Sequence, residues 1–292
     1  GWFPFPNSVL LKGNLPDGRS LGTVADFFLD GARTLWRSPH LVAVLTAAIG
    51  TLVLARGRGN RGGTHLIFLF LITLTLHVLF ADTGWFFRYE AYLVVFGIAA
   101  TGACTAALSQ RIATKRAAFA AALAASFLAI PLLVRGAYAV TRTPIAMRDI
   151  GQHYGNLGHF LARYYNGRSV ATTSIGAVNY FADVRDLDLW GLASMPVARL
   201  KRQGAYDRQA IERLVHDHGA ETIATYGHWF DRYGGVPTNW VKVADWQATD
   251  VNAVLPGPVL TFWAPDVDRA AKLRRQLHAF APGVERSGVH VL

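Results

Sequence analysis

Four long apolar runs dominate the first half of the chain and set its predicted architecture. They cover residues 39–55, 64–81, 91–109 and 117–139. A helix needs roughly 20 predominantly apolar residues to cross a bilayer, so each run predicts a transmembrane helix. The first run is the weakest, because its apolar part is short and contains Thr46 and Thr51. Pro131 predicts a kink in the fourth.

A shorter amphipathic segment precedes these runs. Between residues 21 and 37 the apolar side chains recur at spacings of three and four, and Asp26 and Asp30 face away from them. This period is that of one helix face. We therefore expect a helix that lies along the membrane surface. Its apolar positions are Val24, Phe27, Phe28, Ala32, Leu35 and Trp36.

The pattern changes near Thr143 and Pro144, where shorter apolar segments replace the long runs. Residues 145–167 predict a helix packed close to the membrane. Strands and helices then alternate, which predicts a small α/β domain. Asp207 and Asp266 are predicted helix N-caps, and Gly219 is a predicted C-cap. The expected strands are 169–174, 186–192, 221–226, 239–246, 258–264 and 288–292, and the expected helices are 175–181, 207–219 and 266–281.

Three regions follow from these patterns. Residues 1–38 form an outer loop and interfacial helix, 39–143 a region of four transmembrane helices, and 144–292 a soluble α/β domain. Composition agrees, because 52% of the 292 residues are hydrophobic and only 16% are charged, below the usual quarter of a soluble domain. Cys104 is the only cysteine, so no disulfide can form within the chain.

Charge is distributed unevenly between the two halves. The net charge is +10, and residues 1–143 carry 13 Lys/Arg against 5 Asp/Glu, whereas residues 144–292 carry 16 against 14. The excess positive charge therefore belongs to the membrane half. A nucleic-acid-binding protein would instead place a basic face on a recognisable soluble module, so we expect no nucleic-acid partner.

Loop charges predict how the spans are oriented. The loops 56–63 and 110–116 each hold three basic residues and no acid, whereas the loop 82–90 holds one Arg and two acids. By the positive-inside rule the two basic loops are cytoplasmic. The loop 82–90, the N-terminal segment and everything after residue 140 are then extracytoplasmic.

The loop between the second and third spans, within ADTGWFFRYEAYL (81–93), carries the main candidate site. An aromatic belt at the membrane boundary accounts for Trp85, Phe86 and Tyr92. It does not account for Arg88 or Glu90. Arg88 beside Tyr89 is suited to hold a phosphate through several N–H donors, and Glu90 could position a hydroxyl or act as a base. From the residues alone, a site and a belt remain equally open.

Other candidates have simple structural alternatives. Asn7 and Lys12 in PNSVLLK (6–12) precede the interfacial helix, and Lys12 could meet an anionic headgroup or could snorkel from a turn. His77 is an ionisable residue within a span, hence a functional candidate, or a neutral histidine hydrogen-bonded to another helix. The pair Asp186 and Asp188 could share a divalent ion, or could be solvated carboxylates at a strand end.

Several stretches taken together resemble bacterial glycosyltransferases of the GT-C superfamily. They are PNSVLLK, GWFFRYEAYL between two spans, and SIGAVNYF (174–181) followed by DLDLWGL (186–192). The pattern is similar to that of polyprenyl-phosphate-sugar-dependent enzymes of the arabinofuranosyltransferase and mannosyltransferase-like kind. The resemblance covers most of residues 1–192.

The resemblance implies transfer of a sugar from a polyprenyl-phosphate donor to an envelope glycan, lipid or protein on the outer face of the bacterial cytoplasmic membrane. It implies lipid-phosphate contacts for Arg88 and Lys12. Sugar or ion contacts are expected for Glu90, Tyr89, Asp82 and Asn7. The resemblance implies no definite cofactor, although a divalent cation could take part. The catalytic acid of such enzymes lies on an earlier outer loop, so it is expected upstream of this chain, and residues 1–292 alone should be inactive.

Two other functions remain open at this point. The chain could be a non-catalytic membrane protein whose α/β domain binds a ligand or partner, or a transporter fragment with His77, Arg88 and Glu90 along its path. Inverted hydropathy repeats would favour transport, and this sequence has none.

Overall fold

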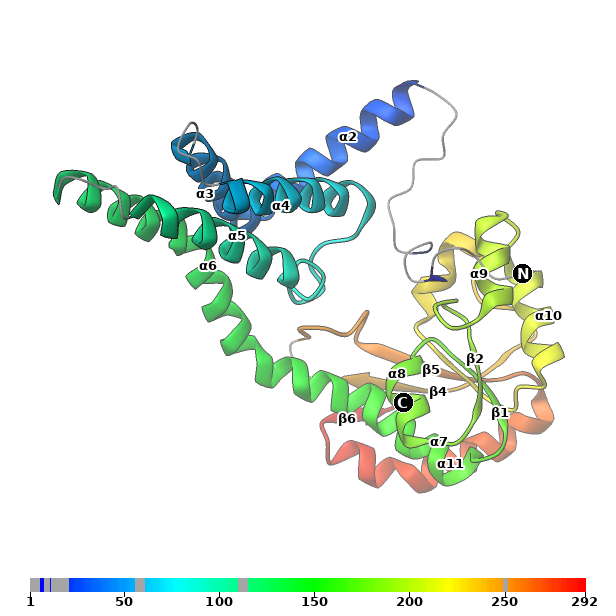
Figure 1. Cartoon of the computed structure of the whole chain (residues 1–292). Helices are drawn as coiled ribbons and strands as arrows, with labels where there is room; N and C mark the ends of the chain where they lie inside the picture. Colours follow the sequence, from blue (N-terminus) through cyan, green and yellow to red (C-terminus); the bar gives the residue numbers. More distant parts are fainter. Residues whose placement is uncertain (1–5, 8–10, 12–20, 56–60, 110–114, 249–251) are drawn as a thin grey trace. The chain divides into compact units, whose positions relative to one another are not determined.

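A computed structural model describes residues 6–7, 11, 21–55, 61–109, 115–248 and 252–292 (Figure 1). Contacts divide the chain into two compact units. One comprises Lys12–Thr141, and the other comprises Arg142–Leu292 together with Gly1–Leu11. We call them the membrane unit and the soluble unit. The division falls two residues before the boundary expected at 143/144.

Helices make up the described part of the membrane unit. They are α2 (Leu21–Trp36), α3 (Pro39–Ala55), α4 (Arg61–Phe80), α5 (Ala91–Ser109) and the first part of α6 (Lys115–Ile150). A helix is therefore present at each of the four apolar runs and at the amphipathic segment. Leu41 of α3, Phe70 of α4 and Leu93 of α5 are fully buried in one apolar cluster.

Two helices in the described ranges are long and apolar enough to cross a membrane, namely Arg61–Phe80 and the continuous Ala121–Tyr165. A third span exists if Val24–Trp36 and Pro39–Ala55, which meet at 93°, count as one bent span. The apolar part of α5, Ala91–Ala106, is shorter. The outward surface agrees with a lipid environment, since Leu69 and Val95 are 54% and 68% exposed. The chain thus has two or three candidate membrane spans.

The two helices expected at 117–139 and 145–167 are not separate but form one continuous helical segment. Both Pro131 and Pro144 lie inside α6, which continues to Ile150. A π-helical turn, η1 (Gly151–Gly155), then leads directly into α7 (Asn156–Tyr165). A proline removes one backbone hydrogen bond, but the bonds on either side can keep the helix continuous.

A close approach of three helices explains Gly97 in α5. A Cβ built there would lie 2.8 Å from the Phe70 ring of α4 and would also collide with Val44 of α3. Small residues at such crossings let apolar helices pack tightly.

Gly97→Ala should therefore destabilise the membrane unit by about 1–3 kcal/mol, the usual cost of overpacking. Thermal unfolding of the detergent-solubilised protein would measure the change. Gly102→Ala is the matched control on the same helix, because a Cβ there meets nothing within 4 Å. A loss of stability at Gly102 equal to that at Gly97 would contradict the packing explanation.

The soluble unit is built on one six-stranded mixed sheet with the order β2-β1-β3-β5-β4-β6 (Figure 1). β1 pairs in parallel with β2 and β3, whereas β5, β4 and β6 continue the sheet in antiparallel pairs. All six predicted strands are confirmed, with ends that differ by at most four residues. The strands are β1 (Ser169–Thr172), β2 (Arg185–Asp188), β3 (Ile223–Thr225), β4 (Val241–Ala248), β5 (Val259–Ala264) and β6 (Val289–Val291).

Helices cover both faces of this sheet. α7, α8 (Ile175–Phe181) and α11 (Val267–Glu285) bury one apolar cluster, which includes Val170 of β1. The next residue, Ala171, belongs to the cluster beneath α10 (Arg208–His218) on the other face. Successive strand residues point to opposite faces, so a strand covered on both sides is apolar throughout.

The capping predictions are confirmed. The Asp207 carboxylate accepts a hydrogen bond from the Ala210 amide, and the Asp266 carboxylate accepts one from the Arg269 amide. Gly219 ends α10 with a φ of 68°. Two short elements were not predicted, α9 (Met195–Arg202) and the 3₁₀ helix η2 (Gly227–Tyr233), because both are short and neither has a long apolar period.

Candidate functional site

The loop that joins α4 to α5, residues 82–90, has an uncommon backbone. Trp85, Phe86 and Phe87 have φ angles of 44°, 61° and 60°, directly after Gly84 at 93°. A left-handed conformation costs a residue with a Cβ roughly 1–2 kcal/mol. Such strain persists only where surrounding contacts hold it, and it is concentrated at functional sites. The loop is therefore the first candidate site in the membrane unit.

Glu90 holds one side of this turn. Its Oε2 accepts a hydrogen bond of 2.9 Å from the Gly84 amide, and its Oε1 lies 3.3 Å from Nε2 of His40. Only 1% of Glu90 and 5% of His40 are exposed. Burial by itself would raise the pKa of the Glu90 carboxyl, but the contacts with His40 and Gly84 outweigh it and hold that pKa below its ordinary value. Glu90 is thus a buried carboxylate whose contacts hold the loop in place.

Arg135 of α6 holds the turn at a second point. Its Nη2 donates a 3.0 Å hydrogen bond to the Phe87 carbonyl oxygen, and its guanidinium carbon lies 4.9 Å from the centre of the Phe87 ring. The His40 ring meets the same phenyl ring edge to face, with the centroids 5.6 Å apart. Side chains from α3 and α6 therefore fix both the backbone and the ring of Phe87.

The clamped turn presents Arg88 to solvent. The Arg88 amide donates to the Gly84 carbonyl, 3.1 Å away, which closes the turn. Its exposed guanidinium lies 5.1 Å from the centre of the Tyr89 ring, with Nη2 3.4 Å from the Tyr89 hydroxyl. Among the described residues, Arg88 has no ion pair with a carboxylate. A guanidinium held in this way is available to an anion such as a phosphate oxygen.

The remaining predicted contacts differ in their surroundings. Asp82 is exposed, and its Oδ1 accepts a hydrogen bond from the Thr83 amide. Asn7 is only 8% exposed and belongs to the soluble unit. Lys12 lies outside the described residues. The lipid-phosphate, sugar and ion roles given to these residues and to Tyr89 and Glu90 stay predictions.

His77 makes the hydrogen bond to another helix that was one of its two expected roles. Its Nδ1 lies 2.9 Å from the Tyr92 hydroxyl of α5, so the hydrogen bond to a second helix is confirmed. His40 and Arg135 are the two residues of the site that sequence reasoning missed. A signal for Arg135 exists, because it is the only charged residue in the apolar run 117–139, and ionisable residues within such runs mark functional or paired positions.

The pair Asp186 and Asp188 has a structural role in the soluble unit. Asp188 is 2% exposed and accepts hydrogen bonds of 2.8 Å from the amides of Trp190 and Ala193, which forms the turn after β2. This turn ends the strand at Asp188, earlier than expected. Neither carboxylate is freely solvated, so that alternative is wrong.

Asp186 is held differently. Its Oδ2 accepts hydrogen bonds from Thr172 and Asn179, and its Oδ1 is buried without a partner among the described residues. Burial raises the pKa of this carboxyl to about 6. In the described part of the chain, no group of three His, Cys, Asp or Glu side chains is arranged to hold a metal ion.

Comparison with known proteins adds one similarity. A family model described as a domain of unknown function, DUF8728, matches residues 143–264, from the end of α6 through β5. No curated protein and no solved structure matches the chain. The family match therefore covers most of the soluble unit and no part of the membrane unit.

Proposed function

We propose that this chain is part of an integral membrane glycosyltransferase that uses a polyprenyl-phosphate sugar. The observation that carries the proposal is the exposed guanidinium of Arg88 on a strained turn, which buried contacts from Glu90, His40 and Arg135 hold in place. A cation prepositioned in this way loses little freedom when it binds a phosphate, and it stabilises the charge that develops as the phosphate leaves. The resemblance of GWFFRYEAYL to GT-C enzymes supports the same assignment.

The proposal includes a topology. The four apolar helices cross the cytoplasmic membrane of a bacterium, and α2 lies along its outer surface. The loop 82–90 and the soluble unit are extracytoplasmic. Arg88 and Lys12 bind the lipid phosphate, whereas Asp82 and Tyr89 contact the sugar or an ion. The acceptor is an envelope glycan, lipid or protein, and the catalytic carboxylate lies upstream of this chain.

Substitution of Arg88 in the full-length protein tests the proposal. Arg88→Ala should lower kcat/KM for the donor about 10- to 100-fold, the loss expected when a charge-assisted hydrogen bond of about 1.5–3 kcal/mol disappears. Arg88→Lys should keep part of the activity, because a point charge remains without the bidentate geometry. Transfer would be measured separately from polyprenyl-phosphate arabinofuranose and polyprenyl-phosphate mannose.

Arg61→Ala is the matched control, since Arg61 is an exposed arginine at the other end of α4. Its kcat/KM should equal that of the unsubstituted protein. Full activity of Arg88→Ala would contradict the proposal that Arg88 binds the donor phosphate. Failure of the unsubstituted protein to transfer either sugar would count against the proposed function itself.

A further inference from the structure

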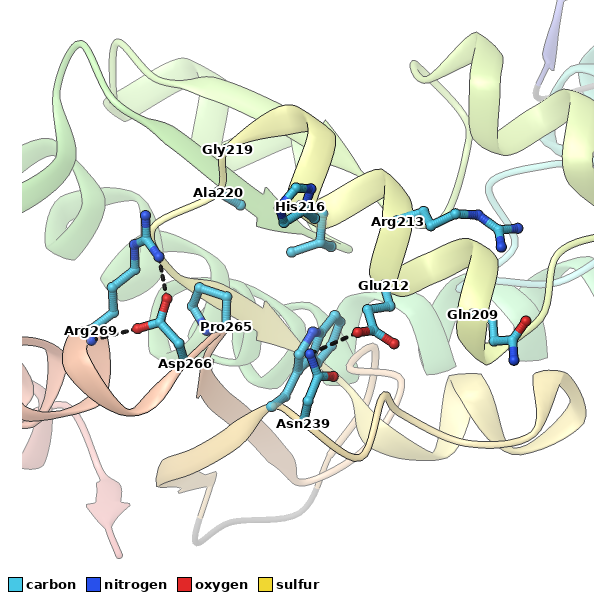
Figure 2. A pocket seen from close by; sticks show the side chains of 12 residues that line it. Gln209, Glu212, Arg213, His216, Gly219, Ala220, Asn239, Pro265, Asp266 and Arg269 are labelled. Atoms are coloured by element: carbon cyan, nitrogen blue, oxygen red, sulfur yellow. Dashed lines mark hydrogen bonds and ion pairs between the residues drawn. The ribbon is translucent and has the colours of Figure 1, made fainter.

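A polar groove crosses the soluble unit at the edge of the sheet where β3 begins and β5 ends. Its volume is about 610 Å³, within the usual range of ligand pockets. β5 runs antiparallel to β3, so the turn after β5 lies at the same edge as the start of β3. The groove is bounded by α10, the segment before β4, and the start of α11 (Figure 2). It lies at the opposite end of the parallel strands from the Asp186–Asp188 turn.

Apart from His216, the ionisable side chains that line this groove balance in charge. Arg213 and Arg269 are balanced by Glu212 and Asp266, and Arg269 is itself paired with Asp266 at the start of α11. A phosphate site would need an excess of cationic side chains, and a divalent-ion site would need an excess of carboxylates. The balanced lining therefore favours an uncharged ligand.

Planar polar groups supply the hydrogen-bonding capacity. Figure 2 shows that Asn239 faces Glu212, where Nδ2 donates a 2.9 Å hydrogen bond to Oε1. This bond orients both groups and leaves Oδ1 of Asn239 and Oε2 of Glu212 with acceptor capacity. Gln209 and Arg213 are exposed on the same helix and add donors and an acceptor. Donors and acceptors gathered along one groove can pair with the hydroxyl groups of a sugar.

An aromatic side chain completes the lining. Trp240 borders the groove while it is 6% exposed, because the rest of its ring packs in the apolar cluster under α10. A rigid indole edge beside planar polar groups suits a ligand with both C–H and O–H surfaces. We propose that this groove binds a neutral oligosaccharide. That the oligosaccharide is the acceptor glycan of the reaction rests on the function proposed above.

Binding measurements on the full chain in detergent test the groove directly. The probes are a linear arabinan hexasaccharide and a linear mannan hexasaccharide, with oligogalacturonate hexasaccharide and inorganic phosphate as anionic comparisons. We expect a neutral hexasaccharide to bind more tightly than either anion by titration calorimetry. Binding of neither neutral probe, or tighter binding of an anion, would overturn the proposal.

Two groove variants locate the binding. Gln209→Ala and Asn239→Ala should each lower the affinity for the neutral hexasaccharide about fivefold. This is the effect of losing one hydrogen bond of about 1 kcal/mol. Gln203→Ala is the matched control, because Gln203 is an exposed amide at the end of α9, outside the groove. Equal affinity of the groove variants and the control would place the binding elsewhere and overturn the assignment.

These measurements distinguish the binding role of the groove from the proposed glycosyltransferase function. Arg88→Ala should leave oligosaccharide affinity unchanged while it lowers transfer. If the groove binds a hexasaccharide and the protein transfers no sugar, the groove stands and the glycosyltransferase function fails. If transfer occurs, Asn239→Ala should raise the KM for the acceptor without lowering kcat.

Discussion

Glu90→Ala should lower the free energy of unfolding of the membrane unit by about 1.5–3 kcal/mol, the usual contribution of a hydrogen bond to a charged group. The substitution leaves His40 buried without its carboxylate and leaves the Gly84 amide without an acceptor. The strained turn from Trp85 to Phe87 then loses the contact that spans it. SDS-induced unfolding in mixed micelles would measure the change.

Two variants make this result specific. Glu90→Gln should be milder than Glu90→Ala, because a glutamine oxygen can still accept from the Gly84 amide. Asp82→Ala changes an exposed acid of the same loop and should shift stability by less than about 1 kcal/mol. Glu90→Ala as mild as Asp82→Ala would show that the buried pair does not hold the loop. If Arg88 binds the donor phosphate as proposed, Glu90→Ala should also lower transfer, since the turn that positions Arg88 loosens.

Trp246→Ala should destabilise the soluble unit by about 3–5 kcal/mol, as expected for a large aromatic residue removed from a packed core. Trp246 is fully buried, and its ring lies 4.5 Å from the ring of Phe262 and 6.0 Å from that of Phe160, measured between centroids. The substitution leaves a cavity between the sheet and the helices α7 and α11. Thermal unfolding followed by near-ultraviolet circular dichroism would report it.

Trp246→Phe tests whether packing is the cause. The indole Nε1 has no hydrogen-bond partner among the described residues, so a phenyl ring removes an unsatisfied polar group while it keeps most of the contacts. We expect it to cost less than half as much as Trp246→Ala. Tyr180→Ala, at a ring that is 82% exposed, should change stability by less than about 0.5 kcal/mol. A comparable loss at Tyr180 would contradict the cavity explanation.

Local patterns along the chain were sufficient to predict most elements. The strands of the soluble unit carry continuous or alternating apolar residues, and the caps at Asp207, Asp266 and Gly219 depend on contacts within one helical turn. The prediction failed where a local signal was overruled. Helices were expected separately at 117–139 and 145–167, yet α6 continues through Pro144, because one missing hydrogen bond is a small part of a long helix.

Prediction from the sequence was also limited for the number of spans and for the DLDLWGL segment. Apolar composition locates α3 and α5, but the lengths of these helices depend on where the neighbouring loops begin. Helix length decides whether a helix can cross a membrane, so two or three candidate spans remain where four were expected. The strand expected over 186–192 ends at Asp188, because its carboxylate accepts from the amides of Trp190 and Ala193 instead of pointing into solvent. Such side-chain-to-backbone bonds compete with strand pairing and leave little trace in hydropathy.

The sequence by itself determined the division into an apolar helical region and an α/β domain, and it singled out Arg88 and Glu90 as charges that an aromatic belt does not need. Only the tertiary structure decided that Glu90 is buried against His40, that Arg135 reaches Phe87, and that segments from α10 to α11 enclose a polar groove. The physical reason is how far apart along the chain the interacting residues lie. Helix and strand periods and caps arise from residues a few positions apart, whereas these contacts join residues about 50 positions apart through the packing of several elements.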